Sequence, residues 1–218
     1  MIELDLMRSL PRAKRDVAAR HAAQTPENVA LARRFGREYF DGSRDTGYGG
    51  YVYDGRWIPV ADDIVRYFEL EAGARILDVG CAKGFLVKDL RARQPGLEAY
   101  GLDLSDYALR HAEPEAARYL VRGTCEALPF RDASFDVVIA KDVIHNQTRA
   151  GCVRALREIE RLAPGRGFVQ VDAYRDETER DTFFRWVLTA RTVCDPDGWR
   201  EIFAEAGYRG TYYWTIIE

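Results

Sequence analysis

A glycine-rich loop after a short apolar strand is the first place in the sequence that could hold a ligand. Residues 75–84 read Arg-Ile-Leu-Asp-Val-Gly-Cys-Ala-Lys-Gly, and a helical pattern follows them. Gly80 and Gly84 allow the backbone to approach a ligand closely. The free N–H groups in the first turn of the next helix can then face that ligand. The loop therefore predicts an adenosine-cofactor site at the end of an α/β sheet.

A dinucleotide fits this loop poorly. When the fingerprint G-x-G-x-x-G is laid on Gly80, its second and third glycines fall on Ala82 and Phe85. Asp78 also faces the place where an anionic pyrophosphate would lie. An acid there suits a cationic or amino-bearing ligand better, and S-adenosylmethionine carries both a sulfonium and an α-ammonium group.

A second acid ends the next predicted strand. Residues 98–103 read Glu-Ala-Tyr-Gly-Leu-Asp, so Asp103 stands 23 positions after Gly80. A carboxylate at this place can accept hydrogen bonds from both ribose hydroxyls of an adenosine cofactor.

Five segments together resemble the class I S-adenosylmethionine-dependent methyltransferases of the small-molecule type. They are ILDVGCAKG (76–84), GLDLS (101–105), TCEALPF (124–130), SFDVVIA (134–140) and LREIERLAPGRGFVQVDAY (156–174). The resemblance covers roughly residues 61–174 as a core. Outside it, residues 39–42, 47–57 and 207–214 look like a bacterial subfamily of the type 11 methyltransferases.

The resemblance implies which residues hold the methionine part, the ribose and the adenine: Asp78, Gly80, Cys81, Gly84, Asp103, Leu104, Cys125, Glu126 and Ala140. Asp103 would bind the ribose hydroxyls and Leu104 would cover one adenine face. From charge alone, Arg56 or Lys83 could pair with the cofactor carboxylate. Ala82 stands where the family usually has glycine, and we expect a slightly displaced loop without loss of binding.

The methyl acceptor is expected beside Lys141-Asp-Val-Ile-His-Asn146. His145 is one of only three histidines, and the unperturbed pKa of histidine suits a base near neutral pH. His145 is the first candidate base and Asp142 the second; a hydrogen-bonded histidine packed under the cofactor is the alternative for His145. Further residues are expected to line the acceptor site: Tyr48, Tyr51, Asn146, Tyr174, Trp186 and Tyr213.

The family implies transfer of a methyl group to oxygen or nitrogen of a small-molecule acceptor, such as a metabolite, sugar or natural-product intermediate. An RNA or protein methyltransferase, or an inactive cofactor-binding scaffold, are the alternatives. The net charge of −3 gives no reason to expect nucleic acid. The four cysteines are widely spaced, which predicts no metal site and a cytoplasmic protein. No apolar run predicts a membrane span, and a monomer or a homodimer is expected.

Alternating strand and helix patterns must position these residues. Strands are predicted at 75–79, 98–103, 118–122, 135–140 and 167–172, with helices between them, including 149–162 and 196–206. The fold class is α/β: a doubly wound, mostly parallel, seven-stranded Rossmann-like sheet, with an antiparallel C-terminal hairpin at its edge by resemblance. Residues 61–218 are expected to form this core. Residues 1–60 are expected to form a helical cap, helical over 8–40, followed by an aromatic lid.

Overall fold

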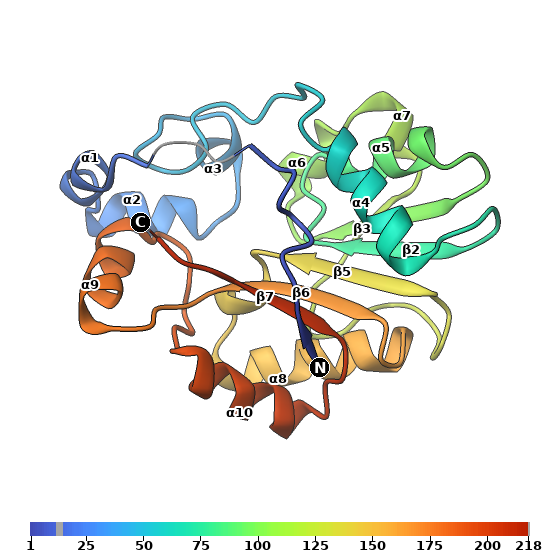
Figure 1. The fold of residues 1–218 in the computed structure, drawn as a ribbon. Coiled ribbons are helices and arrows are strands. Elements are labelled where there is room, and N and C mark those ends of the chain that lie inside the picture. The colour runs from blue at the N-terminus through green and yellow to red at the C-terminus, as the bar shows by residue number, and fades with distance from the viewer. Residues whose placement is uncertain (12–14, 218) are drawn as a thin grey trace.

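One parallel sheet organises the protein. The computed structural model describes residues 1–11 and 15–217, and within them seven strands pair side by side (Figure 1). From one edge to the other they are β1 (Ile2–Glu3), β7 (Thr211–Thr215), β6 (Gly167–Asp172), β5 (Val137–Lys141), β2 (Arg75–Val79), β3 (Glu98–Asp103) and β4 (Leu120–Arg122). Every pair of neighbours runs parallel. The predicted doubly wound α/β class is confirmed.

Helices cover both faces of the sheet (Figure 1). In chain order they are α1 (Val17–Ala22), α2 (Pro26–Ala32), α3 (Arg37–Phe40), α4 (Ile58–Phe68), α5 (Phe85–Arg93), α6 (Asp106–Arg110), α7 (Pro114–Ala117), the 3-10 turn η1 (Ile144–Asn146), α8 (Arg149–Leu162), α9 (Glu177–Trp186) and α10 (Pro196–Ala206). None of the helices among the described residues has the length and apolar character to cross a membrane.

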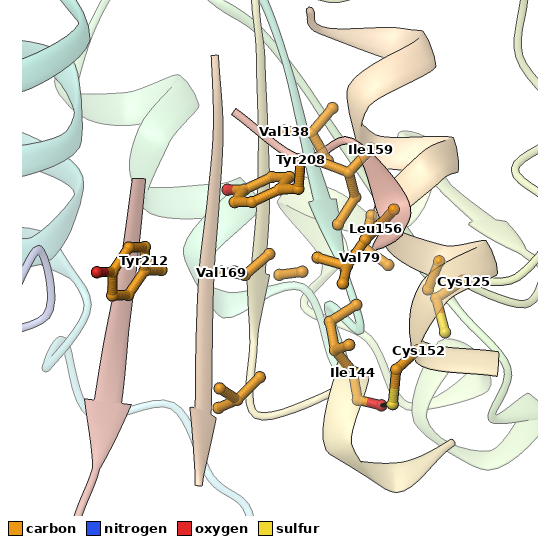
Figure 2. Packing of buried hydrophobic residues seen from close by; sticks show 14 of the residues in the cluster. Val79, Cys125, Val138, Ile144, Cys152, Leu156, Ile159, Val169, Tyr208 and Tyr212 are labelled. Carbon is orange, nitrogen blue, oxygen red and sulfur yellow. Dashed lines mark hydrogen bonds between the residues drawn. The ribbon is translucent and has the colours of Figure 1, made fainter. Parts of the chain in front are cut away.

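Two apolar layers hold the sheet between its helices. Successive residues of β2 serve opposite faces, since Ile76 packs in the cluster of α4 and α5, whereas Leu77 packs in that of α8 and α10. Figure 2 shows the second layer, where Val138 and Val169 of neighbouring strands face Leu156 of α8. Because β2 and β5 are buried on both faces, they read as continuous apolar runs. These central strands give the loops at their carboxyl ends a rigid base.

The expected antiparallel hairpin at the C-terminal edge is wrong. β7 pairs with β6 in parallel register, with Phe168 beside Thr211 and Asp172 beside Thr215. The connection from β6 to β7 runs through α9 and α10, and a helical crossover returns the chain in the same direction as the first strand. The edge place beyond β7 is taken by β1, which also runs parallel.

The N-terminal region is less regular than expected. The helical prediction for residues 8–40 holds only in part: the described part of that range holds three short helices joined by turns, and residues 12–14 lie outside the described residues. α2 begins after Thr25, whose Oγ1 accepts a hydrogen bond from the N–H of Asn28 at 3.2 Å. Gly36 and Gly42 break the pattern further along, and a segment of turns leads to α4.

Candidate active site

A hollow opens at the carboxyl end of the sheet, where the strand order reverses. After β2 the chain builds β3 and β4 on one side, then returns to add β5 on the other side of β2. Ligands of open α/β sheets bind at such a point. The loops after β2, β3 and β5 and the N-terminal cap line the hollow, with Phe35, Tyr39, Phe40, Tyr48, Val79, Gly80, Ala82, Leu102, Asp103, Leu104, Gly123, Cys125, Lys141, Asp142, Val143, Asn146 and Gln147.

The turn after β2 depends on its glycine. Gly80 has φ +80°, and a Cβ added there would lie 1.9 Å from Cγ2 of Val143. The loops after β2 and β5 therefore touch at a position where only glycine fits. Ala82 also lies in the left-handed region, at φ +50°, which costs a residue with a Cβ about 1–2 kcal/mol. Gly84, at φ +78°, precedes α5 without a side-chain cap, so the free N–H groups of α5 begin at this turn.

Asp103 braces the loop and still faces the hollow. Its Oδ2 accepts a hydrogen bond from the N–H of Ala82 and its Oδ1 one from the N–H of Ser105, both at 2.8 Å. Burial raises the pKa of Asp103, and these backbone hydrogen bonds partly offset the rise. Each carboxylate oxygen has a further lone pair. The residue can therefore take two ribose hydroxyls while it holds the loop.

Asp78 is a buried carboxylate without a hydrogen-bond donor. It is 6% exposed, and no residue in the described part of the chain donates a hydrogen bond to its side chain. Burial and the nearby charge of Asp103 raise the pKa of Asp78 to about 7, although Lys141 opposes the shift. A buried charge without a partner is costly. The end of β2 is therefore electrostatically prepared for a cationic ligand.

The predicted adenine contacts divide into two groups. Leu104, 42% exposed, and Cys125 line the hollow as apolar surfaces. Glu126 turns away and forms an ion pair with Arg154 of α8. Cys81 also lies outside the lining, since its Sγ packs where a side chain on Gly101 would be. Burial raises the pKa of the Cys81 thiol well above its ordinary value, so it stays protonated.

Three further expected cofactor contacts lie outside the hollow. Ala140 is fully buried within β5, and the lining begins at the next residue, Lys141. Arg56 is bound to Asp54, with Nε 2.9 Å from both carboxylate oxygens. Lys83 is 8% exposed and donates to Asp41. Both predicted cations are paired with carboxylates of the protein itself, and neither lines the hollow.

Asp142 belongs to the part of the hollow that is lined by the loop after β5. This residue follows β5 with φ +56°, and its carboxylate forms an ion pair with Lys141. Burial alone would raise the pKa of Asp142, but the charges of Lys141 and His145 bring it below its ordinary value. Asn146 lines the hollow and donates from Nδ2 to the carbonyl of Asp142 at 3.1 Å. Both predicted residues therefore line the hollow.

His145 is tied into the protein rather than turned toward the hollow. It is 3% exposed; its Nδ1 accepts a hydrogen bond from the N–H of Asp172 at 3.1 Å, and its Nε2 lies 3.5 Å from Oδ2 of Asp172. Its carbonyl accepts from the N–H groups of Arg191 and Thr192. This geometry matches the alternative of a hydrogen-bonded structural histidine. The role of His145 as a base stays a prediction.

Asp142, His145 and Asp172 form a compact cluster. One ligand-type atom of each lies within 4.8 Å of those of the other two. Lys141 already neutralises Asp142, and the N–H of Asp172 occupies the lone pair of His145 Nδ1. Burial raises the pKa of Asp172, with His145 opposing the shift and Asp142 adding to it. The cluster therefore holds two carboxyl groups whose pKa values are shifted in opposite directions, Asp142 downward and Asp172 upward.

Of the aromatic residues expected around the acceptor, some lie at the hollow and others lie away from it. Tyr48 lines the hollow, and Tyr51 stacks on Phe85 with ring centroids 4.7 Å apart. Trp186 instead packs under Arg20, whose Cζ lies 4.9 Å from its ring centroid. Tyr174 and Tyr213 also lie outside the lining. Tyr213 belongs to β7, beside Gln170.

Three aromatic residues that sequence reasoning did not include complete the hollow: Phe35, Tyr39 and Phe40. They come from the end of the cap. These residues directly precede the glycine-rich aromatic segment, and this position could have indicated that they line the site. Because residues 8–40 were predicted as helical, they were not grouped with that segment.

Comparison with known proteins agrees with this geometry. Residues 77–171 match the family model described as "Methyltransferase domain". The malonyl-(acyl-carrier protein) O-methyltransferase of Legionella pneumophila is 31% identical over 126 residues, which are 56% of this chain and 43% of that protein. The ubiquinone/menaquinone biosynthesis C-methyltransferase of Geotalea uraniireducens is 33% identical over 127 residues, 53% of this chain and 52% of that protein. The chain thus spans about half the length of these relatives.

Solved structures show the same fold. A putative methyltransferase in complex with the Haloferax volcanii Trm112 methyltransferase activator superposes with a TM-score of 0.55, at 24% identity over 67% of this chain and 66% of that one. The YcgJ protein of Bacillus subtilis gives a TM-score of 0.54, at 21% identity over 70% and 68%. The resemblance that the motifs indicated is confirmed: residues 77–171 form a methyltransferase domain, and the chain has the fold of a solved methyltransferase structure.

Proposed function

We propose that the protein transfers a methyl group from S-adenosylmethionine to oxygen or nitrogen of a small-molecule acceptor. The observation that carries this proposal is the buried Asp78 carboxylate, which has no hydrogen-bond donor among the described residues. It directly precedes the lining residues Val79 and Gly80, while Asp103 and Asp142 line the hollow themselves. Three carboxylates against one paired lysine favour a cationic ligand over an anionic pyrophosphate. S-adenosylmethionine has the required cationic groups and the ribose that Asp103 can bind.

The acceptor proposal is supported by unused hydrogen-bond acceptors. Asn146 Oδ1, which lines the hollow, and Gln170 Oε1, outside the lining, are buried and have no hydrogen-bond partner among the described residues. Gln170 donates from Nε2 to Thr215 Oγ1 at 2.8 Å, and that hydroxyl lies 3.5 Å from Asp142 Oδ1. Buried polar atoms in native proteins are normally paired. A hydroxyl or amine acceptor would bring the missing donors, which an apolar carbon nucleophile would not.

In methyl transfer, the main task of the protein is to position the methyl donor and the acceptor. When bound, the cofactor supplies a methyl group already activated by its sulfonium. In that chemistry the acceptor's lone pair would gain the methyl carbon, and sulfur would keep the electron pair of the C–S bond. Asp78 and Asp103 would fix the donor, and the aromatic cap would exclude water. A proton released by the acceptor would pass into the cluster of Asp142, His145 and Asp172, of which Asp142 lines the hollow.

The cellular setting is also part of the proposal. All four cysteines are free and three of them are buried. Reduced thiols are typical of the cytoplasm, and we place the protein there, as a monomer or a homodimer. The net charge of −3 favours a small acceptor over RNA.

Calorimetric titration with S-adenosylmethionine and, separately, NAD tests the proposal. We expect micromolar binding of S-adenosylmethionine alone. Asp103→Ala should weaken it by about 1–3 kcal/mol, because it removes the ribose acceptor and leaves the Ala82 N–H unpaired. Asp106→Asn, an exposed acid that pairs with Arg122, serves as the matched control and should bind normally. Binding of neither cofactor would favour the scaffold alternative, and binding of NAD would refute the proposal.

A further inference from the structure

One carboxylate, Asp41, ties the aromatic cap to the loop that faces the cofactor site. It directly follows α3, and its two oxygens accept hydrogen bonds from Lys83 Nζ at 2.8 and 2.7 Å. The hydroxyl of Tyr107 donates to it at 2.8 Å and the N–H of Tyr51 at 3.1 Å. This number of donors uses the acceptor capacity of a carboxylate almost completely. Asp41 is therefore the centre of a built polar contact.

Lys83 gives this contact its place in the site. It lies in the turn between Gly80 and Gly84, is 8% exposed, and donates a further hydrogen bond to the carbonyl of Tyr51 at 2.8 Å. An ammonium has three donors, and all of them point to the cap. Lys83 thus holds the cap instead of reaching a ligand.

A second tie reaches the loop after β3. Ser105, two residues beyond Asp103, donates from Oγ to the carbonyl of Phe35 at 2.5 Å. Tyr107, which donates to Asp41, belongs to α6 of the same connection. The cap is therefore fastened to both loops that would hold the cofactor, the one after β2 and the one after β3.

The fastened segment also forms a wall of the hollow. Phe35, Tyr39, Phe40 and Tyr48 line it beside Gly80 and Asp103. Tyr51 covers the start of α5 by stacking on Phe85, with an interplanar angle of 10°. If Asp41 released Lys83, this wall would separate from the loops, and the hollow would lose one side.

We propose that Asp41 and Lys83 are positioning residues that dock the cap segment 35–51 on the cofactor loops, so that cap docking and cofactor binding are one coupled event. The proposal rests on the proposed function for the identity of the ligand. Coupling of this kind is reciprocal: a docked cap strengthens cofactor binding, and the cofactor stabilises the docked cap. Lys83 is buried and Asp41 is partly buried. Removing one partner of such an ion pair leaves the other charge uncompensated, so either single variant should undock the segment.

The test measures affinity and cap order separately. S-adenosylhomocysteine is the probe, titrated by calorimetry into the wild type, Asp41→Asn and Lys83→Met, followed by amide hydrogen exchange. We expect the Kd to rise about tenfold or more in both variants. The amides of residues 35–51 should exchange faster, while those of α8 stay unchanged. In the wild type, the ligand should slow exchange of residues 35–51.

Three further variants keep the result interpretable. Asp45→Asn removes an equal charge from an exposed position of the same segment and should leave the Kd unchanged. Lys83→Arg keeps the charge and should restore part of the affinity. Tyr107→Phe removes one hydrogen bond at the rim and should raise the Kd about two- to fivefold, which remains measurable if Asp41→Asn does not fold.

Two outcomes would overturn the proposal: a Kd within twofold of the wild type in both Asp41→Asn and Lys83→Met, or unchanged exchange of residues 35–51 in them. If the wild type itself binds no S-adenosylhomocysteine, the proposed function fails. The exchange of the ligand-free variants then still decides whether Asp41 and Lys83 dock the cap.

Discussion

Asp78 makes the stability of the folded protein depend on pH. Its pKa is raised to about 7 by burial and by Asp103, whereas an unfolded aspartate titrates near 3.9. Between these values the folded protein holds a proton that the unfolded chain has released. Stability from this group is therefore present below about pH 4 and is lost as the pH rises toward about 7. A cationic ligand would compensate the cost, because it favours the ionised form.

Replacing Asp78 with a neutral residue should raise the stability of the protein at high pH and weaken its binding of the cofactor. We expect Asp78→Asn to raise the free energy of unfolding by about 1–3 kcal/mol at pH 8 and to change it little at pH 4. The affinity for S-adenosylmethionine should fall at least about tenfold. Urea denaturation at the two pH values and calorimetry check both effects. Asp181→Asn, an exposed acid of α9, is the control, and an equal gain in both variants would contradict the argument.

Ala82 stores a small amount of backbone strain. At φ +50° the methyl group costs about 1–2 kcal/mol, whereas glycine there would add chain entropy to the unfolded state and lose a buried methyl. We therefore expect Ala82→Gly to change the free energy of unfolding by less than about 0.5 kcal/mol. Ala204→Gly, in the exposed interior of α10, should cost about 1 kcal/mol. Urea denaturation measures both free energies of unfolding. If Ala82→Gly and Ala204→Gly lose similar amounts of stability, the backbone strain at Ala82 is absent.

At the scale of elements, η1 fastens the end of β5 to the end of β6. His145 receives the N–H of Asp172 on its Nδ1 and two further N–H groups on its carbonyl. The sheet ladder alone does not supply these contacts. The short turn therefore fixes the two strand ends that carry the acceptor side of the hollow.

Removing this imidazole should weaken the protein more than the cofactor site. His145→Ala leaves the buried N–H of Asp172 unpaired, which should cost about 1–3 kcal/mol of stability. Affinity for S-adenosylmethionine should change less than about threefold, since His145 does not line the hollow. Denaturation and calorimetry measure the two effects. His21→Ala, an exposed histidine of α1, should stay within about 0.5 kcal/mol, and equal stability of both variants would remove this role from His145.

The regular elements of the core could be predicted because their signals are local. The apolar run of β2 and the stripe and end signals of α8 give their observed bounds, 75–79 and 149–162. The direction of β7 could not be predicted in this way, since it depends on the crossover through α9 and α10. The range 8–40, predicted as helical, is divided into three short helices for a related reason: its last aromatic residues pack on distant segments, and Phe40 shares a cluster with Ala82 and Ala108.

The candidate site shows the same limit. Gly80, Asp103 and Asp142 stand at strand ends, and the sheet brings strand ends together, so their convergence follows from the pattern. Glu126, Arg56 and Trp186 lie away from the hollow because each has a partner that the sequence does not reveal, namely Arg154, Asp54 and Arg20. The direction of a side chain is decided by such long-range partners.

At the scale of the whole molecule, the hollow lies between the regular parallel sheet and the less regular N-terminal cap. The sheet supplies acids and glycine turns at fixed strand ends, and the cap supplies aromatic walls held through Asp41 and Ser105. A ligand in the hollow would contact both parts. Binding should therefore stabilise the cap and the core together, beyond the site itself.

The rise in Tm caused by a bound ligand should show whether the cap and the core are stabilised together. A ligand that binds only the folded state at 100 times its Kd adds about 2.7 kcal/mol, which for a chain of this size corresponds to a rise in Tm of about 5–11 °C. S-adenosylhomocysteine should produce this rise in one cooperative transition by differential scanning calorimetry, and NAD at equal concentration should produce none. Asp103→Ala should lose most of the rise, while Asp106→Asn should keep it. A ligand-dependent split into two transitions would show instead that cap and core respond separately, and that the ligand contacts only one of them.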